Sequence, residues 1–407
     1  MPSARTAIAH PLALPLYDLG EGHPMTTVRY RLALELIRAY GLLDRPDVDL
    51  IDARPATVEE ITRVHAPAYV RAVRRYSDDP MLGHSLEARQ WGLTPGGDTP
   101  PVEGLHDRAA AVCGVALAAA RAVWEGRAQR AIAVGGGLHH AFANRAAGFC
   151  VYNDPAVAIQ ALLDAGCERV AFVDVDAHHG DGTQFIFYEE PRVLTCSVHE
   201  EGSFLFPGTG WLQERGAGAG EGTAINVPLP AYAGDAPYLR AVEEVVAPAV
   251  LAFRPQALVI EPGWDGYHAD VLTHLQITLD GFAGVNRLLG ELAQEATGGR
   301  MTVIGGGGYT GDILARGTTL LFAEMLGVDL PDEIPGEWLA LARELTGQEP
   351  NARLRGEVQF EAPAGQRAAA DARAAAVIGR ARALLGPAAT PLRRRPPARG
   401  SGPRAAG

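Results

Sequence analysis

The chain has 407 residues, and its hydrophobic content of 47% is enough to fill a large buried core. Its formal net charge is −12, with 36 basic against 48 acidic side chains. This acidic balance excludes a general attraction to nucleic acid or to an anionic membrane surface, so we expect neither among the partners.

Short apolar runs and longer helical patterns alternate along the chain. Six segments have the spacing of helices: residues 28–40, 107–125, 155–165, 236–253, 279–297 and 311–326. Five short runs rich in apolar, β-branched residues are expected to be buried strands: residues 130–134, 169–175, 193–198, 257–260 and 301–304. Strands separated by helices predict an α/β fold whose mostly parallel central sheet has helices on both faces.

The pattern predicts one large domain followed by two different C-terminal segments. Residues 1–350 contain no linker or repeat and are expected to form a single domain. Residues 351–385 are expected to be a helical extension, with an Ala/Arg-rich helix from residue 366. Residues 386–407, rich in Arg, Pro and Gly, are expected to be disordered.

The four cysteines are widely spaced and form no Cys-x-x-Cys pair, so neither a disulfide framework nor a thiolate metal site is indicated. No apolar stretch reaches the roughly 20 residues of a membrane helix. The first twenty residues lack the apolar run of a secretion signal. We therefore expect a cytoplasmic protein.

Polar clusters follow four of the expected strands, at residues 135–140, 176–181, 263–265 and 305–309. Ligands of an open α/β sheet bind beyond the carboxyl ends of its strands, so these clusters are expected to converge on one site. Asp174, Asp176 and His178 alternate at one strand end and are expected to share a side. A carboxylate beside an imidazole suits Zn²⁺ or Fe²⁺. A hydrogen-bonded Asp–His pair is the alternative, but the neighbouring clusters favour a metal.

His139 and His140 follow three glycines, which allow a tight turn. Each could be oriented by its own carboxylate, which sets tautomer and basicity, and Asp174 and Asp181 are the candidates. Tyr309 follows four glycines without the Lys-Ser/Thr of a phosphate loop. A tyrosine presented in this way can donate its hydroxyl to a developing oxyanion.

Four segments, in this order, resemble the histone deacetylase superfamily, and most closely its bacterial acetoin-utilisation deacetylase branch. They are GFCVYND at 148–154, DVDAHHGDG at 174–182, FPGTG at 206–210 and the glycine–tyrosine loop. The resemblance spans about residues 17–327. It implies an arginase/deacetylase-type fold, with residues 1–350 as the deacetylase catalytic domain, and hydrolysis of the amide of Nε-acetyl-lysine.

The resemblance implies a metal centre and an accessory ion. Asp176, His178 and Asp265 would bind one Zn²⁺ or Fe²⁺, leaving coordination positions for water and the substrate carbonyl. A structural K⁺ would lie nearby, bound largely by backbone carbonyls around Asp174 together with the hydroxyl of Ser197.

The catalytic roles are also implied by the resemblance. His140, paired with Asp181, would be the general base for the water and then the acid for the leaving amine. His139, paired with Asp174, would contribute charge and orientation. Tyr309 would share the oxyanion with the metal.

The substrate would enter a tunnel. Phe149, next to Gly148, and Phe206 match its aromatic walls, and Asp98 matches a rim aspartate that binds the substrate backbone. Arg29 aligns with an arginine of the product-exit channel. An acetylated protein is the implied partner, with acyl-CoA synthetases as candidate substrates.

Two residues depart from the family pattern around Asp265. Relatives commonly have a smaller residue in place of Trp264, and proline in place of Val271. We expect both departures to leave the ligand in place but to narrow or reshape the pocket, which affects the preference for acyl length.

Three other hypotheses about the function of the chain are open. Arginase-type ureohydrolases bind two manganese ions through further carboxylates, where this chain has Gly180 and Tyr267. An acetylpolyamine amidohydrolase would share the catalytic residues, and only residues 76–97 offer a segment that could close the tunnel. A non-catalytic acyl-lysine-binding module would be expected to have lost the base, a ligand or the tyrosine, and all are present.

Overall fold

The computed structural model describes residues 5–10, 17–356, 365–386 and 391–392. Its core is one eight-stranded sheet in the order β2-β1-β3-β8-β7-β4-β5-β6. All neighbouring strands are parallel. The strands are β1 Thr6–His10, β2 Val48–Asp52, β3 Arg130–Ala133, β4 Val170–Asp174, β5 Val193–Glu200, β6 Ala224–Leu229, β7 Ala257–Glu261 and β8 Met301–Ile304.

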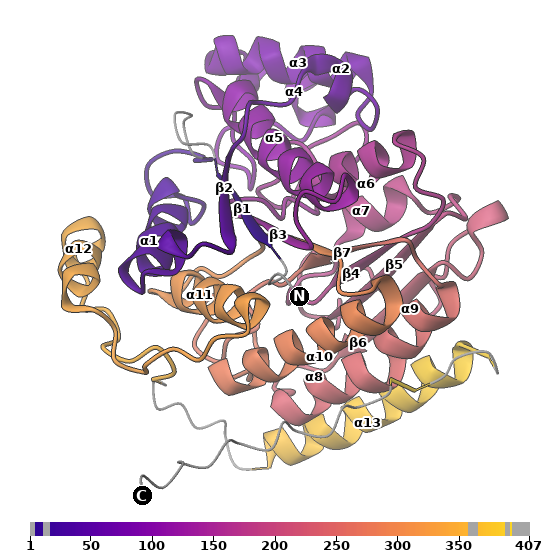
Figure 1. Cartoon of the computed structure of the whole chain (residues 1–407). Helices are drawn as coiled ribbons and strands as arrows, with labels where there is room; N and C mark the ends of the chain where they lie inside the picture. The colour runs from indigo at the N-terminus through magenta and orange to yellow at the C-terminus, as the bar shows by residue number, and fades with distance from the viewer. Residues whose placement is uncertain (1–4, 11–16, 357–364, 387–390, 393–407) are drawn as a thin grey trace, which may run out of the picture.

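Helices cover both faces of the sheet, as Figure 1 shows. The α-helices are α1 Thr27–Ala39, α2 Val58–Ile61, α3 Pro67–Asp78, α4 Leu86–Gln90, α5 Leu105–Trp124, α6 Asp154–Asp164, α7 Asp181–Ile186, α8 Asp235–Ala241, α9 Ala247–Phe253, α10 Leu279–Thr297, α11 Ile313–Leu326, α12 Gly336–Thr346 and α13 Gln366–Leu384. A π-helical segment, Val242–Val246, joins α8 to α9, so the helix expected over residues 236–253 is continuous with a π-turn inside it.

Alternate residues of the strands belong to two separate hydrophobic cores. On β3, Ile132 packs into the larger core with α1, α10 and α11, whereas Ala131 and Ala133 pack into the smaller core with α5 and α6. This alternation follows from the strand period of two, and both faces are buried because helices cover both. The predicted α/β class and parallel sheet are confirmed.

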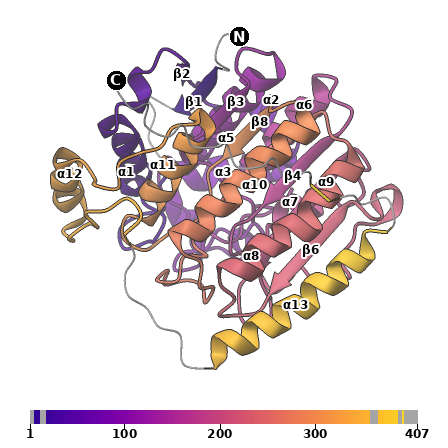
Figure 2. The ribbon, with the colours of Figure 1, turned by 60° about the horizontal axis from the view of Figure 1, so that its bottom comes forward.

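Three strands were not expected from the sequence: β1, β2 and β6. β6 lies at an edge of the sheet and contains Pro228, which is tolerated there because an edge strand leaves backbone N–H groups unpaired. Helix α13 packs against β6 and α8 and so covers this edge, as Figure 2 shows. The segment expected to be disordered, residues 386–407, lies almost wholly outside the described residues.

Among the described helices, none combines the length and apolarity needed to cross a lipid bilayer.

Candidate active site

The polar clusters that follow β3, β4, β7 and β8 meet at the carboxyl ends of these strands. β3, β8, β7 and β4 are consecutive neighbours in the sheet, so the loops after them are brought together. A cavity at this position is lined by residues of three of these loops and of neighbouring segments: Met25, Tyr30, Gly136, Gly137, His139, His140, Gly148, Cys150, Asp176, His178, Gly306, Gly307 and Tyr309.

Asp176, His178 and Asp265 form a compact group of oxygen and nitrogen donors. Their ligand atoms lie within 4.8 Å of one another. Nδ1 of His178 is 2.8 Å from Oδ2 of Asp265 and 3.3 Å from Oδ1 of Asp176. β4 ends at Asp174, so the turn after it, rather than strand alternation, places Asp176 and His178.

These three residues fit a divalent cation. Burial and the neighbouring Asp176 raise the pKa of Asp265 to about 7, because two carboxylates lie together in a site closed to water. A positive charge between them would relieve this repulsion. One imidazole with two carboxylates is a donor set that suits Zn²⁺ or Fe²⁺.

Backbone amides hold the outer oxygens of the two carboxylates. The N–H of Gly307 donates to Oδ2 of Asp176 (2.8 Å), and the N–H of Ala177 donates to Oδ1 of Asp265 (2.9 Å). A Cβ on Gly307 would lie 2.3 Å from Oδ2 of Asp265, so the close approach of this loop requires glycine. The donors are therefore oriented by rigid backbone.

His139 and His140 are each paired with a carboxylate through Nδ1. His139 lies 2.8 Å from Oδ2 of Asp174, and His140 lies 2.8 Å from Oδ1 of Asp181. The two Nε2 atoms are 3.1 Å apart. This is the pairing that the sequence analysis proposed.

The two histidines differ in charge. Burial opposes a charge on His139, but Asp174, Asp176 and Asp181 outweigh it and raise its pKa to about 9. Burial and the neighbouring charged His139 lower the pKa of His140 well below its usual value. These opposite pKa shifts favour His140 as the neutral member of the pair, as a general base must be, and His139 as the cationic one.

The loop that carries both histidines is anchored by two residues to which the sequence analysis gave no role. Nδ2 of Asn153 donates to the carbonyl oxygens of His139 and Ala141. The carboxylate of Asp154 accepts from the N–H groups of Gly137 and Leu138. Both belong to the GFCVYND segment, so the motif itself was the available signal.

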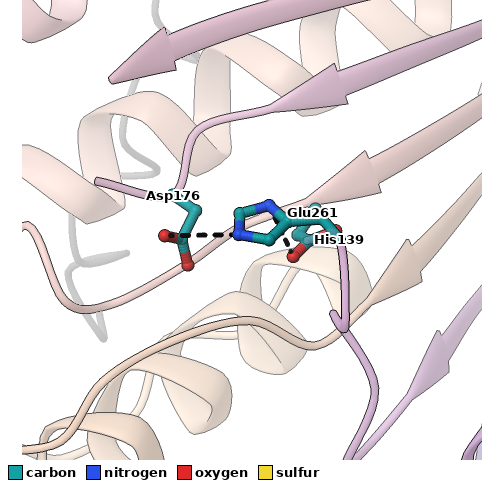
Figure 3. Close-up of side chains that lie close together, drawn as sticks. All are labelled: His139, Asp176 and Glu261. Carbon is teal, nitrogen blue, oxygen red and sulfur yellow. Dashed lines mark ion pairs between the residues drawn. The ribbon is translucent and has the colours of Figure 1, made fainter. Parts of the chain in front are cut away.

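Glu261, the last residue of β7, is a third residue that the sequence analysis left without a role. Its side chain is fully buried, and Oε1 lies 3.2 Å from Nδ1 of His139 (Figure 3). Asp176 lies on the other edge of the ring, 4.0 Å from Nε2. The ring thus has one carboxyl group near each of its two nitrogens.

Tyr309 lies in the wall of the cavity, on the glycine loop after β8. Its backbone N–H donates to Oδ2 of Asp270 (2.7 Å), and the guanidinium of Arg29 lies 4.4 Å from its ring centre. Arg29 also donates from Nε to the carbonyl of Gly308. Burial raises the pKa of Tyr309 well above its usual value, so its hydroxyl remains a proton donor.

Phe149 and Phe206 lie on either side of the catalytic residues. The Phe149 ring is edge-on to Tyr309 at 5.8 Å, and the Phe206 ring is edge-on to His140 at 4.9 Å. Phe149 adopts a positive φ of 68°, and the hydroxyl of Tyr17 donates to its carbonyl (2.7 Å). The loop thus holds the backbone of Phe149 in a strained conformation, with its ring beside the site.

Asp98 lies on the exposed rim and contacts the same loop. Its Oδ2 accepts from the N–H of Gly148 (2.9 Å), and Thr99 accepts from the N–H of Phe149. The predicted rim aspartate therefore orients an aromatic wall and keeps one carboxylate oxygen for another donor.

The expectation that Trp264 narrows the pocket is wrong. Its ring is buried between α10 and α11, edge-on to Phe282 at 5.3 Å, and it closely approaches Gly317. It does not line the catalytic cavity. Val271 also lies outside this cavity, 74% exposed at the surface, where its N–H donates to Thr310.

A two-metal enzyme would have carboxylates where this chain has Gly180 and Tyr267. Gly180 has no room for a side chain, and the Tyr267 side chain lies against other residues. A Cβ on Gly180 would lie 2.2 Å from Oδ2 of Asp174. Tyr267 is buried against His268 and lies near the guanidinium of Arg316. These positions provide no ligands for a second cation.

Ser197, the side chain implied for a potassium site, is buried on β5 in register with Asp174. Its hydroxyl is 2.8 Å from Nδ1 of His199, whose Nε2 is 3.0 Å from the carbonyl oxygen of Gly210. The potassium ion stays a prediction.

The parallel α/β sheet carries, at its carboxyl edge, three donors that could hold a metal, two carboxylate-paired histidines and a tyrosine, an arrangement that suits a hydrolase. The family model of the histone deacetylase domain matches residues 23–325, and the chain belongs to this family. The acetoin utilization protein AcuC of Bacillus subtilis (strain 168) is 39% identical over 324 residues, 79% of this chain and 82% of the relative.

Two further relatives carry the same name. The protein of Staphylococcus xylosus is 36% identical, with 79% of this chain and 83% of the relative aligned. That of Staphylococcus aureus (strain MSSA476) is 35% identical, with 83% and 86% aligned. These matches confirm the predicted resemblance to the acetoin-utilisation branch.

Proposed function

We propose that the chain hydrolyses the amide of Nε-acetyl-lysine in a protein, using one Zn²⁺ or Fe²⁺ held by Asp176, His178 and Asp265. The observation that carries this proposal is the pairing of His139 with Asp174 and of His140 with Asp181 next to that donor set. The chain offers a base, a charge and a cation site within one buried cavity.

The bound cation would polarise the amide carbonyl and lower the pKa of water. His140 takes the proton of the attacking water and returns it to the leaving amine, and Asp181 favours the tautomer in which Nε2 is unprotonated. His139 stays cationic and lowers the cost of negative charge on the substrate. The Tyr309 hydroxyl donates to the oxyanion, and its high pKa keeps the proton available.

The aromatic side chains next to the catalytic residues support a lysine derivative as substrate. Phe149 and Phe206 present apolar faces on the approach to His140 and Tyr309, which suits the aliphatic stem of acetyl-lysine. The free oxygen of Asp98 is placed to accept from a peptide N–H at the rim. We propose an acetylated protein as partner, with an acyl-CoA synthetase as the candidate implied by the resemblance.

The cysteines support a reducing, cytoplasmic setting. Cys113, Cys150, Cys167 and Cys196 are all free thiols and all buried. A chain with several thiols and no disulfide fits a compartment that keeps thiols reduced.

The test compares an acetyl-lysine peptide with acetylputrescine as substrates of the purified protein. We expect a higher kcat/KM for the peptide, because the rim offers an aspartate and aromatic faces for a peptide chain. A preference for acetylputrescine would instead assign the site to small acetylated amines. A His140→Ala variant serves as the blank in both assays.

A further inference from the structure

Glu261 is a buried carboxylate that the mechanism above does not use. It ends β7 in the middle of the sheet, and its side chain has no exposed surface. Neither Oε1 nor Oε2 has a hydrogen-bond partner within the described part of the chain. An unsatisfied buried carboxyl group is costly: burial and the neighbouring Asp174 and Asp176 raise the pKa of Glu261 well above the usual value, and a nearby hydrogen-bond donor is expected.

The compensating group is His139. Nδ1 of this ring lies 2.8 Å from Oδ2 of Asp174 and 3.2 Å from Oε1 of Glu261. The opposite nitrogen, Nε2, lies 3.1 Å from Nε2 of His140. Figure 3 shows Glu261 and Asp176 on opposite sides of the ring.

The backbone explains why two acids reach one nitrogen. β4 and β7 are neighbours in the sheet, and their register places Asp174 beside Glu261. The carbonyl of Glu261 accepts from the N–H of Val175, and Oδ1 of Asp174 accepts from the N–H of Asp176. Both acids therefore project from rigid backbone.

We propose that Glu261 is a positioning residue that, together with Asp174, clamps Nδ1 of His139 between one side-chain oxygen of each residue. The clamp fixes the plane of the imidazole, so that Nε2 stays directed at His140 and at the reacting atoms. Asp174 holds Nδ1 from one direction, and Glu261 adds a second oxygen that restricts tilting of the ring. The inference rests on the proposed function, because His139 acts on the reaction there.

The activity test uses two variants of Glu261 in the metal-loaded full chain. Glu261→Leu removes both oxygens with little change of volume, and we expect kcat for an acetyl-lysine peptide to fall about 10- to 100-fold with KM unchanged, as small misplacements of catalytic groups do. Glu261→Gln keeps one oxygen beside Nδ1, and we expect kcat within about threefold of wild type. Metal content and the thermal midpoint are measured for each variant.

Glu200 provides the matched control. It is also a buried glutamate at the end of a strand, β5, but its carboxylate accepts from the backbone N–H of His274 and lies 2.8 Å from Nδ1 of that residue, outside the catalytic cavity. We expect Glu200→Gln to retain the kcat of wild type. If this control loses as much kcat as Glu261→Leu, the loss does not depend on the contact with His139. That result would overturn the clamp.

A second readout does not depend on activity. In protein labelled with ¹⁵N-histidine, the Nδ1–H signal of His139 is assigned by its absence from His139→Asn. We expect this signal to move in Glu261→Leu and to remain near its wild-type position in Glu261→Gln. An unmoved signal in Glu261→Leu would overturn the clamp, whereas an inactive wild type with a moved signal would overturn only the proposed function.

Discussion

The buried candidate active site and the exposed side chains beside it are built in opposite ways. At the centre, His139, His140 and Asp174 are at most 5% exposed, and each ring is held through Nδ1 by a carboxylate. At the rim, Asp98 is exposed and Phe206 is 45% exposed. The centre is fixed before substrate arrives, whereas the rim has solvent-facing side chains that can adapt to it.

This contrast has a functional consequence. Preorganised charges in a site closed to water stabilise a transition state strongly, so changes at the centre are expected to reduce kcat. Side chains at an exposed rim contribute binding area, so changes there are expected to act mainly on KM. Four substitutions test this division, from the largest effect to the smallest.

His140→Ala is expected to have the largest effect. It removes the neutral imidazole that exchanges protons with water and the leaving amine, and general acid–base groups contribute about 10²–10⁴-fold. We expect kcat to fall by about that factor while the metal content stays at the wild-type level. If His140→Ala keeps a tenth of the wild-type kcat, His140 is not the general base.

Tyr309→Phe is expected to reduce kcat by about 10²–10³-fold, the usual effect of losing one oxyanion donor. The ring contacts with Phe149 and Arg29 are kept in this variant, so we expect no change in the thermal midpoint. Steady-state kinetics measures the loss, and an unaltered kcat would show that the hydroxyl does not contact the oxyanion.

Gly180→Ala adds one methyl group beside the His139–Asp174 pair. Because its Cβ would lie 2.2 Å from Oδ2 of Asp174, the carboxylate must shift, and we expect kcat to fall about tenfold or more. Gly290→Ala, in the helix α10 with open space around the new methyl, is the matched control and is expected to keep wild-type kinetics. Equal kinetics of the two variants would contradict the close approach at Gly180.

Phe206→Ala is expected to have the smallest effect on kcat. Loss of one half-exposed wall should raise KM for an acetyl-lysine peptide about tenfold and leave kcat within about threefold of wild type, since apolar burial of this size contributes about 1–2 kcal/mol. Initial rates over a range of peptide concentrations separate the two constants. A fall in kcat as large as that of Tyr309→Phe would show that Phe206 acts on the chemical step as the buried residues do.

The sequence predicted the candidate catalytic residues better than the residues that hold them in place. The parallel sheet and the meeting of four loops follow from alternating strands and helices. Residue types named Asp174 and Asp181 as candidate partners of the two histidines, and the family resemblance implied the pairing of His140 with Asp181. The contact of Glu261 with His139 was not found, because it depends on β7 lying next to β4, and strand order is not visible in residue spacing.

Two other differences have a similar origin. Trp264 precedes a proposed metal ligand, and proximity along the chain predicted a place in the pocket, but its bulk fills the space left by Gly317 on α11. β6 was not recognised because Pro228 interrupts its pattern, and only the edge position of the strand makes that proline acceptable.

The central claim is that one cation at Asp176, His178 and Asp265 supports the removal of acetyl groups from lysine. The most direct measurement strips the metal from the protein, restores Zn²⁺ or Fe²⁺ separately, and records both bound metal per chain and hydrolysis of acetyl-, propionyl- and longer acyl-lysine peptides. We expect no turnover without metal, and restored hydrolysis of the acetyl-lysine peptide at one ion per chain. Two tightly bound ions per chain, or full activity of the stripped protein, would contradict it.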